Sequence, residues 1–211
     1  MPSEERSLRR QLAKCMASLV SKGLMTGTGG NASVRIGESG ELLITPSGVY
    51  KPDLRADDIV KIDLDGNLLE GARPPSIEWH FHTAIYRRRG DAMAVLHTHS
   101  PYTIGLALAG RQVEPVTVEA AMVLGEVPIL EFMLPGSEEL GRAVGDALTN
   151  HRAAILQNHG VVTAGCNLAE AINIAEVLEA TSKMMFVASL FGGARLIPPD
   201  RIESVRGLNK V

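Results

Sequence analysis

Apolar residues recur every three or four positions in several parts of the chain, which is the spacing of a helix with one buried face. In the first such segment Leu8, Leu12 and Leu19 share a face, so a helix is expected over residues 4–23. In the last segment Leu190 is among the residues expected to face inward. The further helices are expected at residues 77–88, 101–109, 137–148 and 168–191, with Ser76 and Asn167 as caps of the first and last and Ser137 opening the third.

Short apolar or alternating runs between these helices predict strands. Residues 113–118 also alternate like a strand, whereas 120–124 could form a helical turn. The other strands are expected at 34–36 and 41–45 (a hairpin around 37–40), at 57–63 and 66–69 (a second hairpin), and at 93–96, 127–130, 153–157 and 161–163. Strands that alternate with helices predict an α/β fold.

No repeat, linker or low-complexity segment divides the chain, so a single domain over residues 1–211 is expected. Its polar C-terminal tail, 198–211, contains Pro198 and Pro199 and is expected either to dock on a partner subunit or to stay loose.

Composition narrows the class of protein. The chain has 211 residues, 45% hydrophobic residues and a net charge of −3, with both signs scattered. Such a distribution offers no basic face for nucleic acid and no polybasic segment for a membrane surface. The first residues lack an apolar targeting region, and no window approaches the ~18 apolar residues of a membrane span. Cys15 and Cys166 are far apart and are expected to be buried thiols of a reducing compartment, so a cytoplasmic location is expected.

Two histidines, His97 and His99, stand one residue apart at the end of the apolar run 93–96. If this run is a strand, both side chains lie on one face, about 6 to 7 Å apart along the backbone, and could bind one ion. The alternative is a polar strand end whose histidines only hydrogen-bond to neighbours.

A third histidine, His159, also stands at a strand end, between Asn158 and Gly160, where the chain can turn sharply. The ends of sheet strands gather side chains from distant parts of the sequence into one crevice. Three histidines with a carboxylate at a helix start would form a catalytic type of metal site, whose oxygen position is held by Glu78 or by substrate. Zinc fits this ligand set best, and His80 and His151 are expected to lie outside it.

Two turns could bind an anion. In residues 26–34 glycines leave backbone amides free to point at one anion, and in residues 45–49 a hydroxyl stands beside a glycine amide. Such a segment is often only a turn, and no helix follows the first one, as a Walker or dinucleotide motif would require. Beside a metal, however, the two turns and Ser76 would make a phosphate pocket.

Five motifs in order resemble the zinc-dependent class II sugar-phosphate aldolase and epimerase family, over roughly residues 8–191. They are Gly-Thr-Gly-Gly-Asn-Ala-Ser-Val (27–34), Ile-Thr-Pro-Ser-Gly (44–48), Pro-Ser-Ile-Glu-Trp-His-Phe-His (75–82), His-Thr-His-Ser (97–100) and Gln-Asn-His-Gly (157–160). The resemblance implies a three-layer α/β/α sandwich with a mixed central sheet, and a C4 homotetramer with active sites between subunits.

By this resemblance the site residues can be assigned position by position. The metal ligands are expected to be His97, His99 and His159, and the acid/base carboxylate is expected to be Glu78, which could also bind the metal before substrate does. The phosphate contacts implied are Gly30, Asn31, Ser47, Gly48 and Ser76. The expected reaction is cleavage of a phosphorylated sugar, a ketose 1-phosphate, to dihydroxyacetone phosphate and an aldehyde through a metal-stabilised enediolate.

The sequence departs from the aldolase pattern at two positions. Ile77 stands where the aldolases usually have a second serine, so one phosphate hydroxyl is missing. No tyrosine follows Tyr102, although fuculose-phosphate aldolases use one from the adjacent subunit as an acid. Glu119 lies near that place and could replace the tyrosine, or it could be an ordinary solvated charge.

Other reactions could use the same zinc site. An epimerase acting at carbon 4, a methylthioribulose-1-phosphate type of dehydratase and a phosphotetronate type of decarboxylase stay open. Schiff-base chemistry is not expected, because no lysine lies within the motifs. The fold also occurs as a non-catalytic module in adducin, but retention of the three histidines and Glu78 argues against that role.

Overall fold

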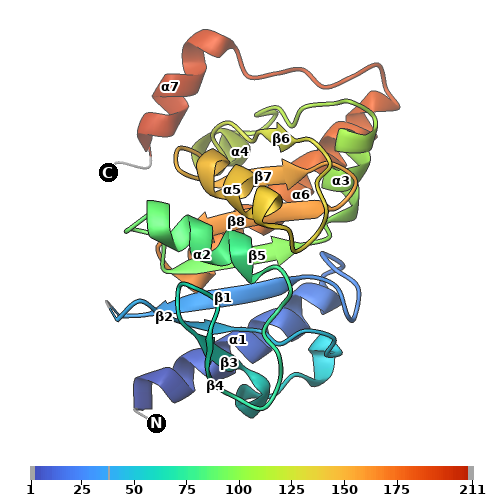
Figure 1. Ribbon diagram of the computed structural model, residues 1–211. Coiled ribbons are helices and arrows are strands. Elements are labelled where there is room, and N and C mark those ends of the chain that lie inside the picture. Colours follow the sequence, from blue (N-terminus) through green and yellow to red (C-terminus); the bar gives the residue numbers. More distant parts are fainter. Residues whose placement is uncertain (1–2, 38, 209–211) are drawn as a thin grey trace.

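The computed structural model describes residues 3–37 and 39–208 (Figure 1). Its centre is one eight-stranded sheet in the order β4-β3-β2-β1-β5-β8-β7-β6. Neighbouring strands are antiparallel except for the parallel pair β6 and β7, so the sheet is mixed. The strands are β1 Asn31–Ile36, β2 Glu41–Ile44, β3 Val60–Ile62, β4 Leu68–Glu70, β5 Ala94–Thr98, β6 Ile129–Leu130, β7 Ala153–Leu156 and β8 Gly160–Gly165.

Helices cover both faces of this sheet. Helices α2 and α5 pack on one face, against side chains such as Ile44, Val95 and Val162. Helices α1, α3, α4 and α6 contribute to the clusters on the other face. The helices are α1 Ser3–Ser21, α2 Trp79–Arg88, α3 Pro101–Leu108, α4 Val118–Val123, α5 Glu138–Ala147, α6 Leu168–Ser189 and α7 Pro199–Gly207, with 3-10 turns η1 Lys51–Asp53 and η2 Ala56–Asp58. The expected three-layer α/β/α sandwich is confirmed.

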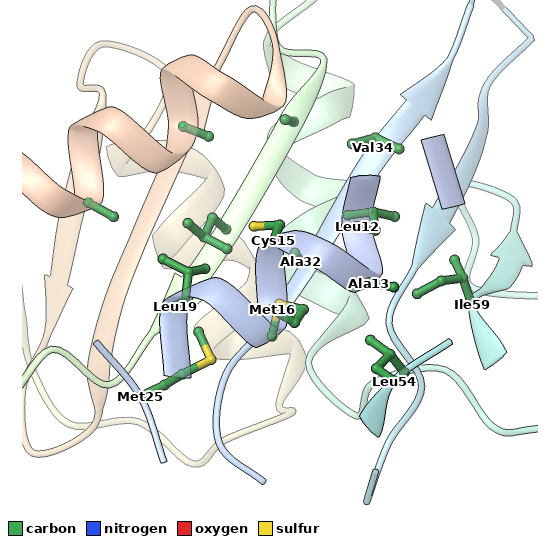
Figure 2. Close-up of a cluster of buried hydrophobic side chains, with 14 of the residues drawn as sticks. Leu12, Ala13, Cys15, Met16, Leu19, Met25, Ala32, Val34, Leu54 and Ile59 are labelled. Carbon is green, nitrogen blue, oxygen red and sulfur yellow. The ribbon is translucent and has the colours of Figure 1, made fainter. Parts of the chain in front are cut away.

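Periodic apolar residues of α1 form the core beside β1 (Figure 2). Leu12, Met16 and Leu19 have no exposed surface and pack among residues that include Ala32 and Val34 of β1. Burial of one such side chain contributes roughly 1.5–3 kcal/mol. The helix is therefore held to the sheet along its whole apolar face, as its periodicity predicted.

Strand β5 occupies the middle of the sheet, between β1 and β8. Its residue His97 is paired with Asn31 on one side and with Val162 on the other. Because side chains alternate along a strand, Asn31, His97 and their neighbour Ser33 lie on the face covered by α2. This register brings the first glycine-rich segment beside the histidine pair.

The start of α2 differs from the prediction. The helix begins at Trp79 rather than at Ile77, and Glu78 occupies the N-terminal cap position. Ser76 is not the cap. Its hydroxyl instead accepts a hydrogen bond from the Glu78 backbone N–H at 3.3 Å. The shift leaves Glu78 with non-helical backbone angles, so its side chain is directed by the turn and not by the helix.

The C-terminal half departs from expectation in three places. Residues 113–118 form no strand, because they find no neighbouring strand to pair with, and Thr117 caps α4 instead. Leu190 is 68% exposed. Residues 199–207 of the tail form helix α7, which packs against α4 of the same chain, so this part of the tail is not loose. Docking of the tail on a partner subunit stays a prediction.

The expected caps of the later helices are confirmed. Ser137 Oγ accepts a hydrogen bond from Leu140 N at 3.1 Å, and Asn167 Oδ1 accepts one from Glu170 N at 2.9 Å. The two cysteines differ: Cys15 is buried as expected, but Cys166 is exposed. Within residues 3–37 and 39–208, no helix is long and apolar enough to cross a membrane.

Candidate active site

Three histidines meet at one end of the strands β5 and β8. His97 is the fourth residue of β5, His99 follows the strand, and His159 precedes β8. Because the two strands are antiparallel neighbours, the residue after one and the residue before the other come together. The three rings offer ligand atoms within 4.8 Å of one another, and no other group of this kind occurs in the described part of the chain.

Local backbone geometry brings His159 to this place. Asn158 has a φ of 60°, in the left-handed region that asparagine tolerates better than most residues. The chain therefore turns sharply between β7 and β8, as the sequence suggested. The centroids of the His97 and His159 rings lie 4.8 Å apart, and those of His97 and His99 lie 4.9 Å apart.

The hydrogen bonds of His97 define its tautomer. Its Nδ1 lies 2.9 Å from the carbonyl oxygen of Val161, so Nδ1 carries the proton and donates it. The Nε2 atom is then left with a lone pair, and it lies 3.1 Å from Nε2 of His99. This outer hydrogen bond is the arrangement that orients imidazole ligands in metal sites.

Burial keeps these imidazoles neutral. It lowers the pKa of His97 to about 3, with the nearby His99 adding to the effect. It also lowers the pKa of His159 to about 4, helped by His97 and opposed by the Glu78 carboxylate. Neutral imidazoles with free lone pairs are the form that binds a metal ion.

Glu78 faces the histidine cluster from the cap of α2. Its Oε2 lies 3.3 Å from Nε2 of His97, and its Oε1 lies 3.3 Å from Nε2 of His159. The Asn31 amide donates to Oε2 at 2.8 Å. The carboxylate is 7% exposed, so it lies in the wall of the site rather than in solvent.

Behind Glu78 a chain of hydrogen bonds runs into the core. The Oδ1 atom of Asn31 lies 2.6 Å from Nε2 of His82, and Nδ1 of His82 lies 2.7 Å from the Ser33 hydroxyl. Since an amide oxygen only accepts, His82 must donate from Nε2 and accept at Nδ1. The Tyr86 hydroxyl completes the chain, at 2.9 Å from Ser33 Oγ. The sequence motifs include both His82 and Asn31, but they did not predict this network.

A pocket of about 240 Å³ opens in front of the cluster. Its lining includes Glu78, His99 and His159 together with all five residues expected to contact phosphate: Gly30, Asn31, Ser47, Gly48 and Ser76. Gly30 has a φ of +66°, and a Cβ atom there would lie 2.6 Å from the carbonyl oxygen of His97. Only glycine lets the first loop come this close to β5.

Lys51 also lines the pocket, although it lies outside all five sequence motifs. It begins η1, three residues after Gly48, and only 2% of its surface is exposed. The signal that could have found it is a lysine close behind an anion-binding turn.

Glu119 does not reach this pocket within one chain. It is an exposed residue in the first turn of α4 and is absent from the pocket lining. His80 and His151 also lie outside the histidine cluster, as expected. The ring of His80 stacks on Trp79, with ring centroids 3.8 Å apart.

The residues of the cluster fit a divalent metal ion. Glu78 Oε1 and His159 Nδ1 are buried without a hydrogen-bond partner among the described residues. Unpaired buried polar atoms are costly, and a cation beside the carboxylate would offset that cost. Three neutral imidazoles with one carboxylate are a donor set that suits zinc.

Comparison with known proteins identifies a family. Residues 10–186 match the family described as class II aldolase and adducin N-terminal domain. The 5-methylthioribulose-1-phosphate/5-deoxyribulose-1-phosphate aldolase of Rhodospirillum rubrum is 36% identical, over 97% of this chain and 92% of the relative. The 3-oxo-tetronate 4-phosphate decarboxylase of Pectobacterium atrosepticum is 35% identical, over 88% of this chain and 86% of the relative.

A solved structure supports the same grouping. An L-fuculose 1-phosphate aldolase superposes with a TM-score of 0.91 and 34% identity, and the match covers 97% of each chain. The match of the family over most of the chain, the similar sequences and the shared fold lead to one conclusion. The chain belongs to the class II aldolase family.

Proposed function

We propose that this protein is a zinc-dependent aldolase that cleaves a ketose 1-phosphate to dihydroxyacetone phosphate and an aldehyde. The observation that carries the proposal is the position of Glu78, which lies 3.3 Å from two histidines of the cluster and lines a pocket with the anion-binding turns. The named activities of the relatives support a deoxy sugar phosphate, since one of them acts on 5-deoxyribulose 1-phosphate.

His97, His99 and His159 would hold the metal. When bound, a divalent ion supplies a Lewis acid that stabilises the negative charge of an enediolate. Gly30, Asn31, Ser47, Gly48 and Ser76, which line the same pocket, would hold the phosphate.

Glu78 would move the proton at the reacting carbon. In the direction of condensation it takes a proton from the hydroxyl-bearing carbon next to the carbonyl, and that carbon then bonds to the aldehyde carbon. In cleavage the bond between these carbons breaks, and Glu78 returns the proton to the same carbon. The Asn31 amide holds Oε2 of the carboxylate at 2.8 Å, which leaves Oε1 free for the transfer.

The aldehyde oxygen needs an acid. We propose that Glu119 supplies it from a neighbouring subunit of a homotetramer. Exposed apolar residues support assembly: Phe186, Leu190 and Phe191 near the end of α6 are 46%, 68% and 84% exposed. Such surfaces commonly mark interfaces between subunits.

Decarboxylation of a phosphorylated oxo acid is the second candidate. The similarity to a 3-oxo-tetronate 4-phosphate decarboxylase favours it, because that enzyme is nearly as similar in sequence as the aldolase. Epimerase and dehydratase reactions would use the same site. In this chain each of them would act in a pocket where Glu78 lies beside the histidine cluster.

A panel of substrates tests the proposal. Dihydroxyacetone phosphate would be incubated with short aldehydes, and 3-oxo-tetronate 4-phosphate would be tested alone, with products identified by mass. An aldolase adds the two masses, a decarboxylase loses carbon dioxide and a dehydratase loses water. Activity that persists after complete removal of metal, or loss of carbon dioxide without any aldol product, would contradict the proposed aldolase.

A further inference from the structure

Lys51 carries a buried positive charge that the chain itself does not balance. Its exposed fraction is 2%, and its ammonium donates only a long hydrogen bond, 3.5 Å, to the carbonyl oxygen of Pro46. Among residues 3–37 and 39–208, no carboxylate forms an ion pair with it. Burial away from water lowers the pKa of Lys51. A buried ammonium without an anion is costly, so its retention needs an explanation.

The backbone holds Lys51 firmly beside the first glycine-rich loop. Its N–H donates to the carbonyl oxygen of Gly27 at 2.6 Å. The Tyr50 ring packs on the same glycine, where a Cβ atom would lie only 2.1 Å from Tyr50 Cε2. These contacts join the two anion-binding turns into one wall and fix the lysine in it.

Lys51 lines a pocket that also offers suitable partners for an oxyanion. Ser47 and Ser76 bring hydroxyls to the same lining, which also includes Gly48 and Asn31. These residues are separate from the cluster of three histidines. The lining of one pocket thus combines two histidines of the cluster with anion-binding groups and a lysine.

We infer that Lys51 is the cationic contact for the phosphate dianion of the substrate. The inference refines the proposed function and rests on it for the identity of the phosphate ester. It also explains how the pocket can bind phosphate with Ile77, 61% exposed, in the place of a hydroxyl. A lysine acts on phosphate as a point charge and so does not depend on one hydroxyl donor.

A buried lysine could instead form a Schiff base with a carbonyl substrate. That reaction forms a bond from Nζ to the carbonyl carbon and releases water, and borohydride would then reduce the imine to a stable adduct. With Lys51 as a phosphate contact, treatment with dihydroxyacetone phosphate and borohydride leaves the protein mass unchanged. An adduct on Lys51 would overturn the inference.

Thermal unfolding with inorganic phosphate tests the contact without any turnover. The metal-loaded wild type is expected to melt at a higher temperature in millimolar phosphate than in sodium chloride of the same ionic strength. The reason is that a ligand stabilises the folded state that binds it. Lys51→Met should lose this gain while melting no lower than the wild type in chloride. Lys22→Met, which removes an exposed lysine, is the matched control and should keep the gain. An undiminished gain in Lys51→Met, or none in the wild type, would refute the role.

Kinetics separate this inference from the proposed reaction. With dihydroxyacetone phosphate, Lys51→Met should raise KM by about 10- to 100-fold with a smaller change in kcat, as expected for a lost hydrogen bond to a charged group. A wild type that binds phosphate through Lys51 but cleaves no sugar phosphate would refute the proposed function alone. A Lys51→Met enzyme with unchanged KM would refute the inference alone.

Discussion

Glu78 contacts two imidazoles of the histidine cluster and the amide of Asn31. These neighbours suit a carboxylate that lies beside a metal ion and transfers a proton. Two imidazoles lie 3.3 Å from its oxygens, and the Asn31 amide holds one of these oxygens. Replacement of Glu78 by Gln keeps the size and a hydrogen-bonding group but removes the basic oxygen. We expect Glu78→Gln to retain metal while kcat falls by about 100-fold or more, the usual effect of losing a positioned acid or base. Metal analysis and steady-state kinetics on the same sample would check this, and near-normal turnover would leave Glu78 with a structural role.

His159 should be needed for the metal itself. It is the one member of the cluster that comes from the turn between β7 and β8, and its Nδ1 has no hydrogen-bond partner in the described chain. His159→Ala removes one of three nitrogen ligands, so we expect bound metal and activity to be lost together. His151→Ala, outside the cluster, is the control. An active His159→Ala protein with a full complement of metal would exclude His159 as a ligand.

At the level of elements, α2 is tied to β1 by polar contacts as well as by apolar packing. His82 of α2 donates to Asn31 and accepts from Ser33, both of β1. His82→Leu would leave those two buried groups without this partner, at a cost of about 1–3 kcal/mol in the free energy of unfolding. Gln offers both a donor and an acceptor, so His82→Gln should be less destabilised. Urea denaturation would rank the two variants, and equal stabilities would mean that these hydrogen bonds contribute little.

Most elements could be predicted from sequence because local pattern and tertiary packing agree there. In α6 the cap at Asn167 and the apolar period are both encoded locally, and β5, β7 and β8 are short apolar runs that are fully buried. The strand predicted at residues 113–118 does not form, because an alternating segment makes a strand only where a partner strand exists. The predicted start of α2 was wrong because two nearby residues, Ser76 and Glu78, could both be read as helix-start residues.

The candidate site divides in the same way. The three histidines were predictable because each stands at a strand end, where an α/β sheet collects side chains. Lys51 could not be predicted as a site residue. Its place in the pocket depends on its burial in η1 against the glycine-rich loop, which is a tertiary property. The network through His82 depends on the register that pairs Asn31 with His97, which no local pattern encodes.

At the scale of the molecule, the sheet order explains why distant residues form one pocket. β5 lies between β1 and β8, so the first glycine loop, the histidine pair and His159 meet at one end of three adjacent strands. Glu78, at the N-terminal cap of α2, reaches the same end of these strands. The site therefore depends on the central strands being assembled, and conditions that weaken the core beneath it should weaken both fold and metal binding.

Acidic pH should weaken the core, because several histidines are buried in it. Burial lowers the pKa of His82 and His97 to about 3 and that of His159 to about 4, against 6.5 for an unperturbed imidazole. Below pH 6.5 the unfolded chain takes up protons that the folded chain does not bind, so stability is present above that pH and is lost as pH falls. The free energy of unfolding should decrease by up to about 1.4 kcal/mol per pH unit for each buried histidine.

Urea midpoints of the metal-free protein at pH 7.5, 6.0 and 5.0 would measure this loss. The window from pH 6.5 to 5.0 isolates the histidines, because the carboxyl groups with resolved shifts, such as Glu5 and Asp63, have lowered pKa values and titrate below it. His82→Gln removes one titrating imidazole from the core and leaves the three proposed metal ligands unchanged. The stability of this variant should therefore fall less steeply across the window. A wild type equally stable at pH 7.5 and 5.0 would mean that these histidines are protonated in the fold, which their burial and the accepting role of His82 Nδ1 oppose.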